Sequence, residues 1–335
     1  MNGSILRCIL RCVRGGLLVV LALASPVNAD VRRVELDNGD IYEGELVDGM
    51  RTGRGVYTWV DGSRYEGDFL DNFLHGRGRY DLADGRTYEG EFNRGRREGL
   101  GVLTWPNEDR YEGSFVEDLP HGTGTFTWAN GDRYEGAFVR GARSGEGEFT
   151  WRDGSRYTGS FLDGVLHGRG EFRWPDERRY IGTFVEGRKQ GLGVLELPNG
   201  NRYEGEFQAD ERDGLGTFYW RDDTVYQGQF QTNKMHGYGV KRQPDGRKEL
   251  QRWSEGQLLE SRILAAEPRC QLELDGRPWM FDSRHCVNGL AHGEGLAVSL
   301  TGEEIILEGR FVLGQRVAGE VSTLKPPRPG APGAR

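Results

Sequence analysis

The sequence has no hydrophobic run long enough to cross a membrane. Its most apolar stretch, residues 17–24, falls well short of the roughly 20 residues that a spanning helix needs. Three arginines precede this stretch and small residues follow it at 27–29, a pattern typical of a secretory signal. We therefore predict a signal peptide over residues 1–29 and an exported, bacterial-type protein located in the periplasm or cell envelope. Retention of the segment as a membrane anchor is the alternative.

Cysteine is scarce, with only 4 in 335 residues. Cys8 and Cys12 lie in the predicted signal and would be removed with it, which leaves Cys270 and Cys286. An even pair in an exported protein predicts a disulfide, which would contribute about 3 kcal/mol to stability. Two unrelated reduced thiols are the alternative. The pair does not predict a zinc site, because only His285 lies beside it.

The chain also lacks an excess of positive charge. Its formal net charge is −8, and loss of the signal removes three arginines and no acidic residue. An acidic chain is a poor general ligand for nucleic acid or anionic lipid. We therefore expect no nucleic-acid partner, and contact with membrane lipid is not favoured.

The sequence does contain one motif that is repeated along most of its length. A tyrosine recurs every 23 residues, nine times without an insertion or deletion. Glycine stands two positions after each tyrosine, an aromatic residue or Leu46 stands four positions after it, and a Gly-x-Gly follows in every unit. A fixed period of this length indicates a repeat array. The nine tyrosines, which begin repeats one to nine, are Tyr42, Tyr65, Tyr88, Tyr111, Tyr134, Tyr157, Tyr180, Tyr203 and Tyr226.

This pattern resembles the MORN repeat, a 23-residue Tyr-x-Gly unit followed by Gly-x-Gly. The resemblance covers about three-fifths of the chain. It implies that each unit is a β-hairpin and that the hairpins stack into an elongated sheet. It also implies a mostly non-enzymatic role as an interaction, dimerisation or lipid-contacting surface.

The residues of each unit independently predict the same hairpins. In repeat four, Tyr111, Gly113 and Phe115 alternate with polar residues, so one face of the sheet should be aromatic and glycine-rich. We expect the aromatic rings to lie in continuous rows over the glycines of the adjacent hairpin. Asp or Asn stands nineteen positions after each tyrosine, and glycine usually follows it, as a tight turn requires. Glu108, Glu177 and Asp223 are the exceptions to this turn pattern.

These observations predict an all-β chain built mainly from one single-layer antiparallel sheet. A signal at 1–29 precedes an array at 30–248, which opens with a half-unit cap. Residues 249–324 are expected to form degenerate repeats and a disulfide-pinned cap, and residues 325–335 a disordered Pro/Gly-rich tail.

No residue set in the repeats indicates catalysis. Five of the six histidines precede a Gly-x-Gly, but those two repeats apart would be separated by roughly 20 Å and would not share a metal ion. The repeated arginine and glutamate beside each tyrosine predict a solvated charge ladder, with no special pair. No glycine-rich phosphate loop opens a helix. We therefore expect no enzyme activity, no metal and no cofactor.

The aromatic face is the best candidate surface, because a single-layer sheet does not bury all of its rings. The hypothesis is an exported scaffold that binds another protein or itself. The alternative is a module that binds an envelope lipid or polysaccharide through the aromatic face. The tryptophans most suited to either role are Trp59, Trp105, Trp128, Trp151, Trp174 and Trp220.

Overall fold

The computed structural model describes residues 30–266, 268–282 and 286–326. The predicted signal, with Cys8 and Cys12, and the tail beyond Pro326 lie outside these residues, as does His285. Within the described chain, no helix is long and apolar enough to cross a membrane.

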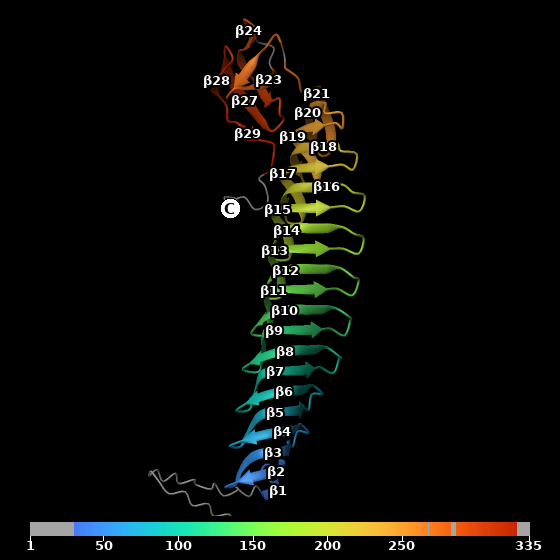
Figure 1. Cartoon of the computed structure of the whole chain (residues 1–335), viewed down its shortest axis with the longest axis vertical. Helices are drawn as coiled ribbons and strands as arrows, with labels where there is room; N and C mark the ends of the chain where they lie inside the picture. Colours follow the sequence, from blue (N-terminus) through green and yellow to red (C-terminus); the bar gives the residue numbers. More distant parts are fainter. Residues whose placement is uncertain (1–29, 267, 283–285, 327–335) are drawn as a thin grey trace, which may run out of the picture.

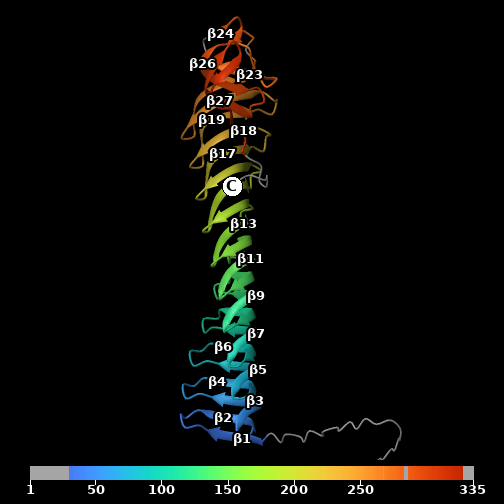
Figure 2. The same cartoon turned by 90° about the vertical axis from the view of Figure 1, so that its left-hand side faces the viewer.

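The first 21 strands form one antiparallel sheet, and each strand pairs with its neighbours in the chain. Figures 1 and 2 show this sheet as a tall, narrow column of stacked hairpins. The prediction of a single elongated sheet is therefore confirmed. The strands are β1 (Asp30–Glu35), β2 (Ile41–Val47), β3 (Met50–Thr58), β4 (Arg64–Leu70), β5 (Phe73–Asp81), β6 (Thr87–Asn93), β7 (Arg96–Thr104), β8 (Arg110–Val116), β9 (Leu119–Thr127), β10 (Arg133–Val139), β11 (Ala142–Thr150), β12 (Arg156–Leu162), β13 (Val165–Arg173), β14 (Arg179–Val185), β15 (Arg188–Glu196), β16 (Arg202–Gln208), β17 (Glu211–Tyr219), β18 (Val225–Gln231), β19 (Lys234–Arg242), β20 (Lys248–Ser254) and β21 (Gln257–Ile263).

Turn chemistry sets the length of every hairpin. The tip between β2 and β3 places Asp48 and Gly49 at φ of 50° and 77°, the two positive values of a tight hairpin turn. The turn that joins one repeat to the next requires a positive φ where glycine usually stands. Glu108 and Glu177 occupy this place at φ of 71°, so these exceptions in sequence keep the turn geometry.

The central packing unit of each repeat is a tyrosine lying across two glycines. A Cβ added to Gly124 would come within 2.5–2.7 Å of the Tyr111 hydroxyl and ring, and one added to Gly113 would meet the Cα of Gly124 at 2.5 Å. The two glycines are cross-strand partners in β8 and β9. Only glycine therefore allows the ring to lie flat on the backbone. All nine repeat tyrosines are at most 1% exposed.

This geometry corrects one expectation. Each tyrosine covers the glycines of its own hairpin, as Tyr111 does, and not those of the adjacent one. The phenylalanines make the contact between repeats instead. Phe138 packs edge-on against Tyr134 in its own repeat and Tyr111 in the preceding one, with ring centroids 5.2 and 5.0 Å apart. Tyrosine and phenylalanine thus alternate in one continuous row.

The first glycine of Gly-x-Gly has a different role. Gly122 adopts φ of 74°, next to a register irregularity between Gly113 and Phe115 on the paired strand. A left-handed residue at a β-bulge favours glycine because it has no Cβ. Phe115 lies on the aromatic face beside this bulge and is 1% exposed.

The remaining strands form a second, smaller unit at the end of the column. Six of them make one sheet and two make a short hairpin. Cys270 and Cys286 are placed at disulfide distance in this unit, with Cα atoms 5.5 Å apart. The strands are β22 (Leu272–Leu274), β23 (Arg277–Asp282), β24 (Cys286–Val287), β25 (Leu290–Ala291), β26 (Gly293–Ser299), β27 (Glu304–Val312), β28 (Gln315–Ala318) and β29 (Ser322–Thr323).

The second unit covers the end of the polar face of the array. Val240 of β19 and Leu250 of β20 share a buried cluster with Val298 and Ile305. Lys248 Nζ donates to the carbonyl oxygens of Leu300 and Thr301, at 3.1 and 2.8 Å. The repeat sheet itself continues past residue 248 through β20 and β21 before the chain enters this unit.

We predict that Gly124→Ala lowers the free energy of unfolding by about 1–3 kcal/mol, because the new methyl group and the Tyr111 ring would occupy the same space. Thr125→Ala, one residue along on the polar face, should cost less than about 1 kcal/mol. Urea unfolding followed by circular dichroism measures both. Equal costs for the two variants would contradict the close approach of ring and glycine.

Candidate functional site

The aromatic face carries two parallel rows of rings. The inner row is the buried tyrosine–phenylalanine series. The outer row holds the six predicted tryptophans, all of which are half-buried and pack against the inner row. Each tryptophan begins the turn that leads to the next repeat. For example, the backbone N–H of Trp128 donates to the Asp132 carbonyl oxygen at 2.9 Å.

The structure brings four of these tryptophans into one unbroken series. Trp128 lies between Phe126 and Phe149, with centroids 4.4 and 5.2 Å away, and the same stacking extends from Trp105 to Trp174. Trp59 and Trp220 are separated from this series by repeats in which Leu82 and Leu197 take the tryptophan position. Neighbouring rings of the series are tilted to one another, with interplanar angles of 35–44°.

Cations lie over these rings, which the sequence analysis did not anticipate. Arg143 has its guanidinium carbon 5.0 Å from the Phe149 centroid and donates to the Gly164 carbonyl oxygen at 2.6 Å. Burial lowers the pKa of Arg143 below its usual range. The cation therefore joins one repeat to the turn of the next and shields the aromatic row. The corresponding cations, nine positions after a repeat tyrosine, are Arg51, Arg97, Lys189 and Arg212.

A sequence signal for these cations existed in the 46-residue spacing from Arg51 through Arg97 and Arg143 to Lys189. The intervening repeats carry Leu74, Pro120 and Leu166 at the same place. The array thus alternates between cationic and apolar repeats over this part of its length.

The opposite face carries the predicted charge ladder. Arg110 pairs with Glu112 at 2.6 Å and Arg133 with Glu135 at 2.5 Å. Both pairs are solvent-exposed, so each contributes well under about 1 kcal/mol. The repetition gives no pair a special environment.

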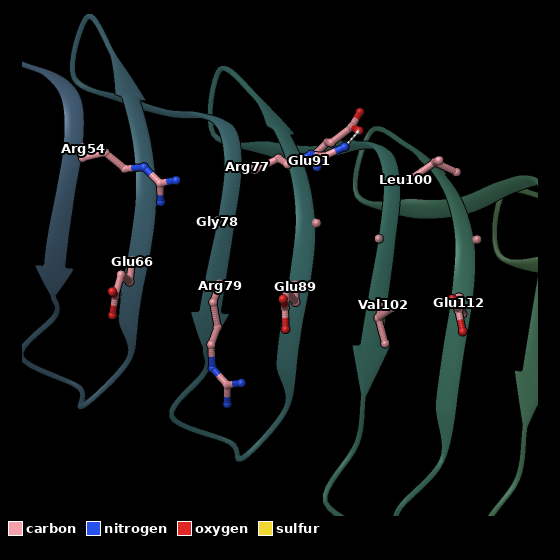
Figure 3. Close-up of a pocket in the computed structure, with 13 residues that line it drawn as sticks. Arg54, Glu66, Arg77, Gly78, Arg79, Glu89, Glu91, Leu100, Val102 and Glu112 are labelled. Carbon is pink, nitrogen blue, oxygen red and sulfur yellow. Dashed lines mark ion pairs between the residues drawn. The ribbon is translucent and has the colours of Figure 1, made fainter.

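A shallow trough of about 790 Å³ runs across this polar face from repeat one to repeat four (Figure 3). Its floor is glycine backbone, including Gly78 and Gly101, and its walls are arginine and glutamate side chains together with Leu100 and Val102. Arg77 reaches Glu91 at 3.7 Å. Figure 3 shows the remaining charged side chains spread along successive strands without converging on one point. The charged side chains of the trough therefore repeat along it and do not gather into one distinct acid–base pair.

The repeat histidines also lie on the polar face, as the pairing of His75 with Asp68 shows. Among the described residues, no three histidine, cysteine, aspartate or glutamate side chains gather to hold a metal ion.

Comparison with known proteins identifies the repeat. The family model described as "MORN repeat" matches residues 42–64, 65–85, 88–110, 111–133, 134–156, 157–177, 180–202, 203–225 and 226–246. No curated protein sequence matches the chain.

Solved structures show only a low likeness. The TCP10 domain of Danio rerio CPAP, in complex with a peptide of Danio rerio STIL, has 15% identity and a TM-score of 0.39, covering 70% of this chain and 99% of that one. The SAS-4 TCP domain of Drosophila melanogaster, in complex with a proline-rich motif of Ana2, has 16% identity and a TM-score of 0.32, covering 52% and 88%. Scores this low carry no argument about function.

We predict that the array unfolds in alkali as its tyrosines ionise. Burial raises the pKa of Tyr111, Tyr134 and Tyr157 to about 12, whereas an unfolded chain ionises tyrosine near about 10. The folded state therefore binds these protons more tightly, and its stability falls as pH rises from about 10 through 12. Tyrosinate absorbance and circular dichroism should change together over this range. Ionisation of all tyrosines near pH 10 with the sheet signal intact would contradict the burial.

Proposed function

Because the chain belongs to the MORN-repeat family, we propose that it is an exported, non-enzymatic scaffold that binds another protein, or a second copy of itself, through its sheet. The observation that carries this proposal is the half-buried tryptophan series from Trp105 to Trp174. Partly exposed tryptophans on a rigid scaffold supply large contact areas at little entropic cost, as protein interfaces require.

The ring geometry favours a protein partner over a glycan. Sugars stack on exposed ring faces, whereas the rings of this series are half-buried and pack against one another at centroid distances of 4.3–5.4 Å. The acidic balance of the chain disfavours anionic lipid. Polysaccharide or lipid binding therefore stays the second candidate.

The proposed export rests on the signal-like residues 1–29 and is consistent with the placement of Cys270 and Cys286 at disulfide distance. The proposed lack of catalysis rests on the repeated, undifferentiated charges of the polar face, in the trough and in the ion pairs beyond it.

The test is crosslinking in intact cells, followed by mass spectrometry of the adducts. We expect a discrete protein adduct that weakens in the double variant Trp128→Leu/Trp151→Leu. Leucine is the matched choice, because Leu82 and Leu197 occupy the same position in other repeats. Thr127→Ala/Thr150→Ala on the polar face is the control. Absence of any protein adduct, with co-sedimentation of the chain with envelope material, would overturn the proposal in favour of the polymer or lipid candidate.

A further inference from the structure

The polar face becomes apolar toward the second unit. The change occurs at the positions twelve and fourteen residues after each repeat tyrosine. In the first six repeats these positions hold charged or hydroxyl side chains, except that repeat one has one apolar residue and repeat three has two, separated by the two arginines of repeat two. In repeats seven to nine they hold six residues, five of them apolar, which we call the apolar stripe: Leu192, Val194, Leu215, Thr217, Tyr238 and Val240.

The array does not need apolar residues at these positions. Repeat two carries Arg77 and Arg79 there, and repeat six carries Arg169 and Glu171. The strands that hold them, β5 and β13, have the same length as β15 and β17 of the apolar stripe. A continuous apolar surface that the hairpins do not require indicates a contact with something else.

The second unit covers one end of the apolar stripe. Val240 is 5% exposed and belongs to the same buried cluster as Leu324, and Tyr238 packs against this cluster. Leu192 and Leu215 lie farther along the array and keep part of their surface exposed. The contact between the two units therefore ends partway along a continuous apolar surface, and the segment that follows Leu324 is the best placed to extend it.

The last described residues leave the second unit beside repeat nine. The Leu324 N–H donates to the Glu303 carbonyl oxygen at 2.8 Å, and Lys325 Nζ lies 3.1 Å from the Glu303 carboxylate. Glu303 and Val240 of β19 line one small cavity of about 230 Å³. Residues 327–335, which lie outside the described structure, therefore continue from a point next to the apolar stripe.

The spacing of the prolines in this segment matches the spacing of the repeats. Pro326, Pro329 and Pro332 recur every three residues. A polyproline II helix has about three residues per turn and rises about 3.1 Å per residue, so these prolines would share one side at intervals of about 9.3 Å. Two strands give a repeat spacing of about 9.6 Å. Pro326 at repeat nine would therefore place Pro329 at repeat eight and Pro332 at repeat seven.

The charges along the array are consistent with this alignment. Arg328 precedes Pro329 and would lie at repeat eight, where Glu206 is the cross-strand partner of Leu192. Glu206 pairs with no cation among the described residues. Repeat six carries Arg169 at the position that Leu192 occupies in repeat seven. The apolar stripe thus ends at the repeat that would receive the last proline of the segment.

We propose that residues 326–335 bind along the apolar stripe as a polyproline II segment, with one proline on each of repeats nine, eight and seven. Such a segment loses little conformational entropy on binding, because its backbone already favours the extended form. It would fasten the second unit to the array and cover Leu192 and Leu215. The tryptophan series lies on the opposite face, so this contact and the scaffold function proposed above stand or fall separately.

Disulfide trapping in the full chain tests the placement, with the two cysteines of the predicted signal replaced by serine. Under mild oxidation, Leu215→Cys/Pro329→Cys and Leu192→Cys/Pro332→Cys should each form a disulfide within one chain. The control Leu192→Cys/Pro329→Cys is out of register by one repeat, about 10 Å, and should stay reduced. Equal trapping of aligned and control pairs, or trapping of none, would overturn the alignment. Disulfides between two chains would overturn the intramolecular contact, because the segment would then come from a second copy.

A peptide of residues 325–335 tests the recognition itself. A chain that ends at Lys325 keeps every described strand and leaves the apolar stripe open. We expect fluorescence anisotropy to show that the labelled peptide binds this chain with a Kd below about 1 mM. It should bind the full chain at least about 10-fold more weakly, because the chain's own segment competes at high effective concentration.

Matched variants of the shortened chain locate the binding site. Leu192→Arg copies the residue of repeat six and should weaken peptide binding about 10-fold or more, with an unchanged circular dichroism spectrum. Leu100→Arg, at the same position in repeat three, should leave binding unchanged. A peptide of the same composition whose prolines are not three residues apart should bind several-fold more weakly. Absence of binding, equal effects of the two variants, or equal affinity of the two peptides would overturn the proposal.

Discussion

The structure depends on the close approach of a tyrosine ring to a pair of cross-strand glycines. Where Tyr111 lies across Gly113 and Gly124, a single added methyl group would occupy the space of the ring or the facing backbone. The ring covers the glycines and so stabilises strands that glycine would otherwise weaken. A single-layer sheet can thereby hold a buried core, because its large side chains lie along the sheet surface and bury one another.

Neighbour contact is what turns these units into a column. Phe138 bridges Tyr111 and Tyr134, and Arg143 reaches the turn of the following repeat while lying over Phe149. Each repeat therefore depends on the next, and stability should be a sum of repeat and neighbour contributions. Such a column presents long surfaces with a fixed period, as the shallow trough across repeats one to four shows.

Much of this architecture could be predicted from the sequence, because the period, the turn residues and the alternation are local signals. The positive φ that this turn requires is found even at Glu177, which stands where most repeats have glycine. What the sequence did not reveal depends on contacts between distant or facing residues. Alternation shows that Tyr111 faces the glycines but not that it covers its own hairpin. Neither the array pattern at Val240 nor the expected degenerate repeats around Leu250 indicated that these two residues share a buried cluster with Val298, more than 40 residues away.

Hydrogen exchange of the intact chain, resolved by mass spectrometry, tests the central claim that neighbour packing of the aromatic row holds the array together. The account predicts slow exchange of comparable rate across the central repeats, with faster exchange toward β1, where one neighbour is missing. Protection that varies independently from one repeat to the next, or that is weakest in the central repeats, would contradict it.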